Sequence, residues 1–169
     1  MPSTRVHDLI TLATGSGGFV MYVKSHPSNW PGALLFTLSY LFSGLMLSAD
    51  LDVRSRPYRR WGPLRFIWWP YMKLIPHRSV LSHGLVVGPL LRVAYLCAVL
   101  GLPFALIVAL GGVAGARGML SALGQFVKAH IKPAALILTG IILGGVAHTL
   151  ADVAASLVAR ALGLGRLRH

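Results

Sequence analysis

Long apolar stretches, separated by short polar and basic segments, dominate the hydropathy pattern of the chain. Four stretches approach the length of about 20 apolar residues that a helix needs to cross the hydrocarbon layer of a membrane. They are residues 9–24, 32–49, 93–115 and 134–158. The pattern therefore predicts an all-α integral membrane protein with about four transmembrane helices, in a single membrane domain that covers residues 1–169.

The predicted spans differ in the strength of their signal. Residues 9–24 are short and rich in glycine, whereas residues 93–115 are the most clearly apolar. Pro103 predicts a kink there, because proline frees a carbonyl group inside a helix. A tight hairpin over residues 84–115 is the alternative, but it would need two crossings from about 32 residues. In the last span the following small residues favour close helix packing: Gly140, Gly144, Gly145 and Ala147.

Residues 53–92, between the second and third spans, form a segment of different composition. Residues 53–78 mix tryptophan and tyrosine with basic side chains, which is typical of segments that lie where lipid headgroups meet water. The basic residues are Arg54, Arg56, Arg59, Arg60, Arg65, Lys73 and Arg78. One interpretation is an interfacial anchor without chemistry. The other adds binding of an anionic lipid or phosphate-bearing substrate by Arg59 and Arg60, beside Trp68 and Trp69, and the two are compatible.

Composition and charge define the class of protein further. Hydrophobic residues make up 55% of the chain and charged residues 12%, which is outside the range of a soluble domain. A net charge of +12 would by itself suggest a nucleic-acid-binding protein. The basic residues cluster between apolar segments, however, as the positive-inside rule expects on the cytoplasmic face of a membrane. We therefore expect membrane lipid, and no nucleic acid, as a partner, with a bacterial inner membrane as the location.

Histidine and aspartate residues gather near the ends of the predicted spans. If residues 53–78 are cytoplasmic, the helix directions bring eight of them to one face of the membrane. They are His7, Asp8, Asp50, Asp52, His77, His83, His148 and Asp152. The chain has no Glu, and its aspartates lie only beside or within apolar helices, where a carboxylate is costly. Ionisable residues in such positions predict a functional site on the cytoplasmic side.

The chemistry of these side chains suits a metal. Imidazole and carboxylate groups without a thiolate bind divalent first-row metals, with zinc favoured and manganese or iron as alternatives. His148 and Asp152 are four residues apart, so on a helix both can reach one ion. Asp50 and Asp52 are two apart and point in different directions on a helix, so one could bind metal while the other orients a histidine. The alternative for each residue is structural, for example a buried ion pair between helices.

Other polar residues have simpler interpretations. Cys97 has no partner in the chain, so it offers neither a disulfide nor a thiolate metal site. Ser79 and Ser82 lie between His77 and His83, but the Gly-x-Ser-x-Gly turn of a serine hydrolase does not surround them. We expect the two serines to be helix N-caps, or hydrogen-bond partners that hold the histidines.

Stretches spread over nearly the whole chain resemble a known family. They are STRVHD, GLMLSADLD, RRWGPLRFIWWPYMKLIPHRSVLSHG and HTLAD. In these stretches the chain resembles the membrane-bound metal-dependent hydrolases described as LexA-binding and inner-membrane-associated. It resembles more closely a related bacterial family described only as metal-binding proteins. The resemblance implies a site for one or two ions with the ligands His7, Asp50, Asp52, His77, His83, His148 and Asp152. Ala49 stands where a proline is expected before the DLD element.

The leading functional hypothesis is a metal-dependent hydrolase at the membrane interface, acting on a phosphoester or lipid. A bound ion would lower the pKa of a water molecule and polarise a phosphoryl or acyl oxygen. Asp52 or Asp8 would be the general base, and Arg78 would stabilise developing negative charge. One alternative is a non-catalytic metal-binding or transport protein, although transporters usually bind their ions near the bilayer midplane. The other is a structural membrane protein with buried His/Asp pairs.

Overall fold

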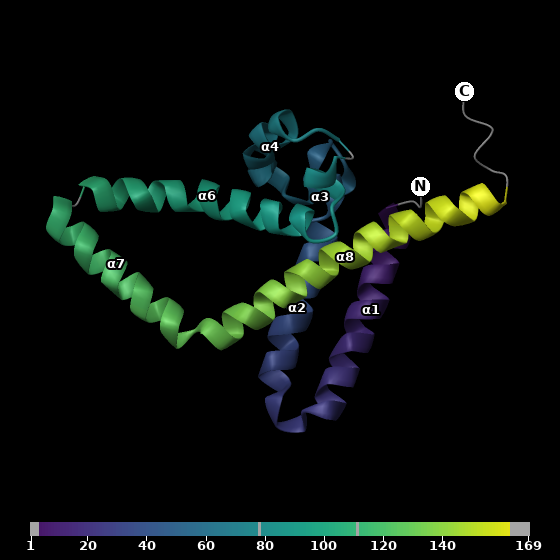
Figure 1. The fold of residues 1–169 in the computed structure, drawn as a ribbon, viewed down its shortest axis with the longest axis horizontal. Coiled ribbons are helices and arrows are strands. Elements are labelled where there is room, and N and C mark those ends of the chain that lie inside the picture. Colours follow the sequence, from purple (N-terminus) through teal and green to yellow (C-terminus); the bar gives the residue numbers. More distant parts are fainter. Residues whose placement is uncertain (1–3, 78, 111, 163–169) are drawn as a thin grey trace.

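The computed structural model describes residues 4–77, 79–110 and 112–162, and this part of the chain is helical without any strand (Figure 1). The long helices are α1 (Thr4–Ser25), α2 (Trp30–Met46), α6 (Val87–Leu110), α7 (Gly112–Ala129) and α8 (Ile131–Ala161). Short helices connect them: η1 (Pro27–Asn29), η2 (Ala49–Asp52), α3 (Arg56–Arg60), η3 (Gly62–Trp68), α4 (Trp69–Leu74) and α5 (Val80–His83). The prediction of an all-α protein is confirmed for the described residues.

The helices are arranged around α8. Figure 1 shows α1 and α2 as an antiparallel hairpin that α8 crosses near one end. The short helices α3 and α4 lie close to that crossing, whereas α6 and α7 run outward and return to the start of α8. Residues from the beginning, middle and end of the chain therefore meet at the crossing.

Glycines on α8 allow its close approach to α2. A Cβ atom on Gly140 would lie 2.5 Å from the carbonyl oxygen of Phe36, and one on Gly144 would lie 2.4 Å from that of Tyr40. Both distances are shorter than any van der Waals contact, so only glycine fits at these two positions. The predicted role of small residues in helix packing is confirmed.

Alanine at position 144 is expected to destabilise the α2–α8 contact by about 1–3 kcal/mol, because its methyl group would meet a backbone oxygen that cannot rotate away. Gly17→Ala in α1 is the matched control, since a Cβ there has no neighbour within 4 Å. This change should instead stabilise the helix by about 0.5–1 kcal/mol. Thermal unfolding in detergent micelles measures both, and equal midpoints would contradict the packing argument.

Helices form over most of the four predicted spans, but among the described residues only two helices are long and apolar enough to cross a membrane. These are α6 over Val87–Leu110 and α8 over Ile131–Val158. Helix α2 has 17 residues, which is at the short limit for a membrane span of about 17–25 residues. Helix α1 has 22 residues but contains several polar and glycine residues. Membrane crossing by α1 and α2 stays a prediction.

The helix that covers the third predicted span begins before it. Helix α6 begins at Val87, whereas the predicted span begins at residue 93. The helix contains Pro103 and continues to Leu110, and no hairpin forms within it. The helical structure resumes as α7 at Gly112, which has a φ of 71° that glycine adopts without strain.

An aromatic cluster packs η3 and α4 against α6. The Trp68 ring is fully buried and lies 5.2 Å from Trp61, 5.6 Å from Tyr71 and 5.5 Å from Tyr95, measured between ring centroids. Such aromatic contacts contribute beyond the area that they bury. Trp68 therefore belongs to the protein core, which corrects its predicted place among lipid headgroups. Trp69 is 55% exposed and could still contact lipid.

Candidate metal centre

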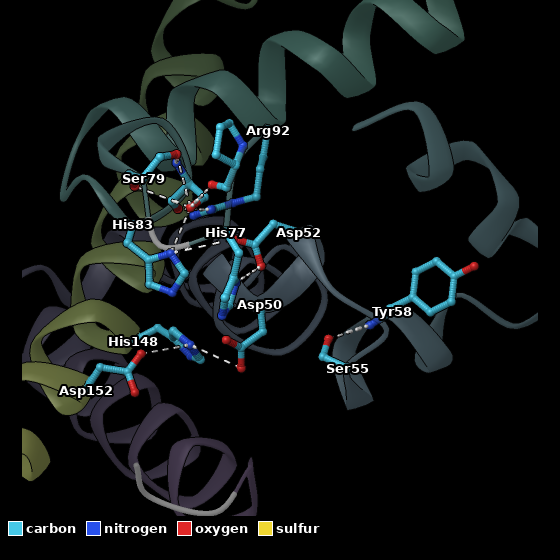
Figure 2. Close-up of polar contacts among 12 residues, drawn as sticks. Asp50, Asp52, Ser55, Tyr58, His77, Ser79, His83, Arg92, His148 and Asp152 are labelled. Atoms are coloured by element: carbon cyan, nitrogen blue, oxygen red, sulfur yellow. Dashed lines mark hydrogen bonds and ion pairs between the residues drawn. The ribbon is translucent and has the colours of Figure 1, made fainter. Parts of the chain in front are cut away.

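The structure brings the seven predicted metal ligands to the region where α8 crosses the α1–α2 hairpin. They are His7 on α1, Asp50 and Asp52 on η2, His77 before α5, His83 at the end of α5, and His148 and Asp152 on α8. Figure 2 shows the His77 and His83 rings pointing toward Asp50 and His148. The contacts divide the seven residues into two groups.

The first group consists of His7, His148 and Asp152. One ligand atom from each residue lies within 4.8 Å of the other two. His7 Nε2 is 3.2 Å from Asp152 Oδ1, and His148 Nε2 is 3.7 Å from Asp152 Oδ2. The two imidazole rings are stacked, with centroids 4.3 Å apart. Asp50 lies at the edge of the group, with Oδ2 3.9 Å from His148 Nε2.

Burial and missing hydrogen bonds indicate that this group fits a metal ion. His7 and His148 are only 5% and 2% exposed. Within the described part of the chain, Nδ1 of His7 and both ring nitrogens of His148 are buried without a hydrogen-bond partner. A buried polar atom without a partner is costly, so such atoms call for an explanation. Neutral imidazole nitrogens next to a carboxylate are the ligands that zinc and related divalent metals prefer.

The second group consists of Asp52, His77 and His83. His77 Nδ1 is hydrogen-bonded to Asp52 Oδ1 at 2.9 Å, and His83 Nδ1 lies 3.8 Å from Asp52 Oδ2. The Asp52 side chain is fully buried, whereas that of His77 is 42% exposed. The Asp52 carboxylate therefore faces two imidazole rings, one of which is accessible from outside.

Hydrogen bonds hold the loop that carries these two histidines. The Ser79 hydroxyl caps α5 by accepting from the backbone N–H of Ser82 at 3.3 Å. Ser82 Oγ is also 2.9 Å from His83 Nδ1. The expected roles of the two serines, as an N-cap and as a partner of a histidine, are confirmed.

Arg92 on α6 is a residue of this region that the sequence reasoning missed. Its side chain is fully buried, and its Nη1 donates to the carbonyl oxygen of Ser82 at 2.7 Å. Figure 2 shows the side chain extending toward the loop that carries Ser79 and His83. The signal available in the sequence was a single arginine inside the apolar run of residues 85–110.

Asp8, a predicted alternative for the general base, lies in neither group. Its carboxylate pairs with Arg60 at 2.5 Å and with Arg56 at 3.9 Å. Arg60 also donates to the carbonyl oxygen of Leu45 at 2.8 Å. Asp8 and Arg60 therefore connect α1, α2 and α3, and lipid binding by Arg60 stays a prediction. Arg78, the predicted anion-stabilising residue, is outside the described residues.

Comparison with known proteins places the chain in a family. The family described as "Uncharacterized metal-binding protein (DUF2227)" matches residues 2–162. The chain belongs to this family. The family description agrees with the metal-binding part of the resemblance found in the sequence, and it does not extend to hydrolysis or to LexA binding. In this family member, the His/Asp group at the helix crossing is a possible metal site.

A relative of this family member is an uncharacterized protein of Aquifex aeolicus (strain VF5). The two are 37% identical over 62 residues, which make up 36% of this chain and 43% of the relative. The match therefore covers less than half of the relative's length. No solved structure matches the chain.

Proposed function

We propose that this protein is a metal-dependent hydrolase embedded in the bacterial inner membrane, with its site on the cytoplasmic side and a phosphoester or lipid as substrate. The observation that carries this proposal is the convergence of His7, His148 and Asp152, whose ligand atoms lie within 4.8 Å of one another. Zinc is the metal that we favour, because it is commonly bound by imidazole and carboxylate, and manganese or iron suit the same ligands.

Two features support a membrane location. The most apolar part of α6 has no residue buried inside the protein, so its side chains need lipid or another apolar partner. The basic residues of α3 and η3 support the cytoplasmic side, where positively charged segments are most frequent. Helices α1 and α2, which pack beside α8, would complete a bundle of about four spans.

The two groups of residues suit two different roles. His7, His148 and Asp152 would hold the ion, with Asp50 at the edge as a further ligand. When bound, such an ion supplies an acidified water molecule and polarises a phosphoryl oxygen. One or two ions suit the residues, and Asp52, His77 and His83 would bind the second if there are two.

With one ion, the second group would transfer protons. The Asp52 carboxylate, 2.9 Å from His77 Nδ1, is placed to accept a hydrogen bond from that nitrogen. This bond fixes the tautomer in which His77 Nε2 can accept a proton. Since the His77 side chain is 42% exposed, a substrate or water molecule can reach it. Asp52 would then position the base instead of acting as the base itself.

Replacing His77 by glutamine is expected to leave the bound metal in place and to lower turnover by about 100-fold or more, because a general base is removed. The assay uses zinc-loaded, detergent-purified protein with model phosphomonoesters, phosphodiesters and phospholipids. Asp152→Asn should lose both metal and turnover, and Arg117→Gln, on the exposed face of α7, should lose neither. Full turnover in His77→Gln would contradict its role in proton transfer, whereas loss of metal would make it a ligand.

A non-catalytic metal-binding protein is the second candidate function. The near-complete burial of His7 and His148 favours it, because structural metal sites are closed by protein ligands and catalytic sites keep an open position. Stoichiometric metal in the wild type without turnover of any of these substrates would support this alternative.

A further inference from the structure

A basic pocket lies in the segment between α2 and α6, apart from the candidate metal centre. It has a volume of about 440 Å³ and is lined by Arg54, Tyr58, Arg59 and Arg65. Arg54 precedes α3, Tyr58 and Arg59 belong to α3, and Arg65 belongs to η3. In Figure 2 the Tyr58 ring points away from the histidine and aspartate side chains. None of the residues that line the basic pocket belongs to either His/Asp group.

The three guanidinium groups of the basic pocket have no acidic partner among the described residues. The chain has four aspartates and no glutamate. Asp8 pairs with Arg56 and Arg60, and the other three aspartates contact histidines. Three like charges around one cavity repel one another, so the arrangement favours a bound anion that lies between them.

The shape and chemistry of the pocket fit a phosphate group. Planar guanidinium groups donate paired hydrogen bonds to phosphate oxygens, and the Tyr58 hydroxyl is a further possible donor. A volume of about 440 Å³ is larger than a lone phosphate requires and lies in the usual range of small-molecule pockets. It leaves room for the polar group that is attached to the phosphate of a lipid.

Exposed apolar side chains close to Arg65 in the sequence indicate where this phosphate comes from. Leu64, Phe66 and Trp69 belong to the same segment and are 56%, 65% and 55% exposed. Exposed aromatic and aliphatic side chains beside arginines are typical of a surface that lies at the level of lipid headgroups. A lipid can satisfy the arginines and these apolar side chains at the same time, which free phosphate cannot.

We propose that the pocket of Arg54, Tyr58, Arg59 and Arg65 binds the phosphate headgroup of an anionic membrane phospholipid. This inference rests on the proposed membrane location, but not on hydrolysis. It changes the predicted lipid-binding pair, because Arg59 acts with Arg54 and Arg65, whereas Arg60 is engaged with Asp8. The bound lipid anchors the segment and is not the substrate of the candidate metal centre.

The test is a titration of the detergent-purified full chain with phosphatidylglycerol, with bound lipid counted by native mass spectrometry. In the pocket variant, Arg54, Arg59 and Arg65 are all replaced by glutamine. The matched control replaces Arg117, Lys128 and Lys132 by glutamine, which removes the same charge from exposed positions on α7 and α8. Phosphatidylglycerol affinity should fall at least about 10-fold in the pocket variant and change by less than about 2-fold in the control. Phosphatidylcholine should bind weakly to all three proteins.

The proposal is overturned if the pocket variant binds phosphatidylglycerol like the wild type, or if the control loses as much affinity. It is also overturned if inorganic phosphate displaces the lipid at equal concentration, because free anion would then be the ligand. Unchanged metal content in the pocket variant shows that it is folded. Asp152→Asn should lose metal and keep phosphatidylglycerol binding, so failure of the metal site and failure of the lipid site are distinguishable.

Discussion

Protein in which His148 is replaced by alanine is expected to bind divalent metal at least about 100-fold more weakly than the wild type. Even the loss of a hydrogen-bond partner of a ligand costs about 10–100-fold in metal affinity, so the loss of a ligand costs at least as much. His148 is one of three residues whose ligand atoms lie within 4.8 Å of one another, and it is also the residue that Asp50 approaches, at 3.9 Å. Asp152→Asn, which keeps the side-chain shape but removes the charge, should act in the same direction.

Chelator competition and elemental analysis of detergent-purified protein measure this effect. His130→Ala is the matched control, because it removes an imidazole that is exposed at the α7–α8 junction. This variant should bind about one or two equivalents of metal, as the wild type does. Equal metal content in all four proteins would place any site elsewhere. Absence of metal from the wild type would instead support the structural interpretation, in which the buried His/Asp pairs hold helices together.

Local spacing made part of this site predictable from the sequence. A separation of four residues brings side chains to one face of a helix, and His148 and Asp152 indeed approach within 3.7 Å on α8. A separation of two residues turns side chains apart. Accordingly, Asp50 faces His148, whereas Asp52 faces His77. Both relationships depend only on the backbone near each pair, which a short stretch of sequence determines.

The partners of distant residues could not be predicted in this way. The sequence analysis assigned His7 and Asp8 to the same membrane face because both precede the first predicted span, but neighbouring residues on a helix point about 100° apart. His7 therefore reaches Asp152 on α8, whereas Asp8 reaches Arg60 on α3. Which residue lies opposite each of them depends on how the helices pack.

The same limit applies to the fold. The composition of residues 53–78 shows that this segment is aromatic and basic. It does not show which ring faces inward: Trp68 is buried, whereas the neighbouring Trp69 is exposed. The close packing of α8 was predictable, because small residues at helical spacing leave room for a neighbouring backbone. Helix α7 was not predicted, because the long apolar stretches that indicate membrane spans do not include this 18-residue amphipathic helix, in which apolar and polar residues are mixed.

Replacing Arg92 by methionine is expected to lower the free energy of unfolding by about 1–3 kcal/mol, the usual cost of leaving a buried hydrogen-bond acceptor without its donor. Arg92 is fully buried, and the negative charges that act on it are those of Asp52 and Asp50. The nearby Tyr71 hydroxyl does not carry a balancing charge. Burial raises its pKa, although the Arg92 guanidinium acts in the opposite direction, so it stays neutral. Without Arg92, the carboxylates lose a counter-charge and the Ser82 carbonyl loses a donor.

Measuring this loss of stability with and without metal shows whether Arg92 acts through its charge or through packing. A bound divalent ion supplies positive charge to the same carboxylates, so Arg92→Met should cost less stability in zinc-loaded protein than in chelator-treated protein. Arg92→Lys keeps the charge and should cost less than methionine in both states, and Arg117→Met on α7 should cost little in either. Denaturant unfolding in mixed micelles measures all of these proteins. An equal loss with and without zinc would mean that Arg92 acts through packing and its bond to Ser82, and that the carboxylates do not need its charge.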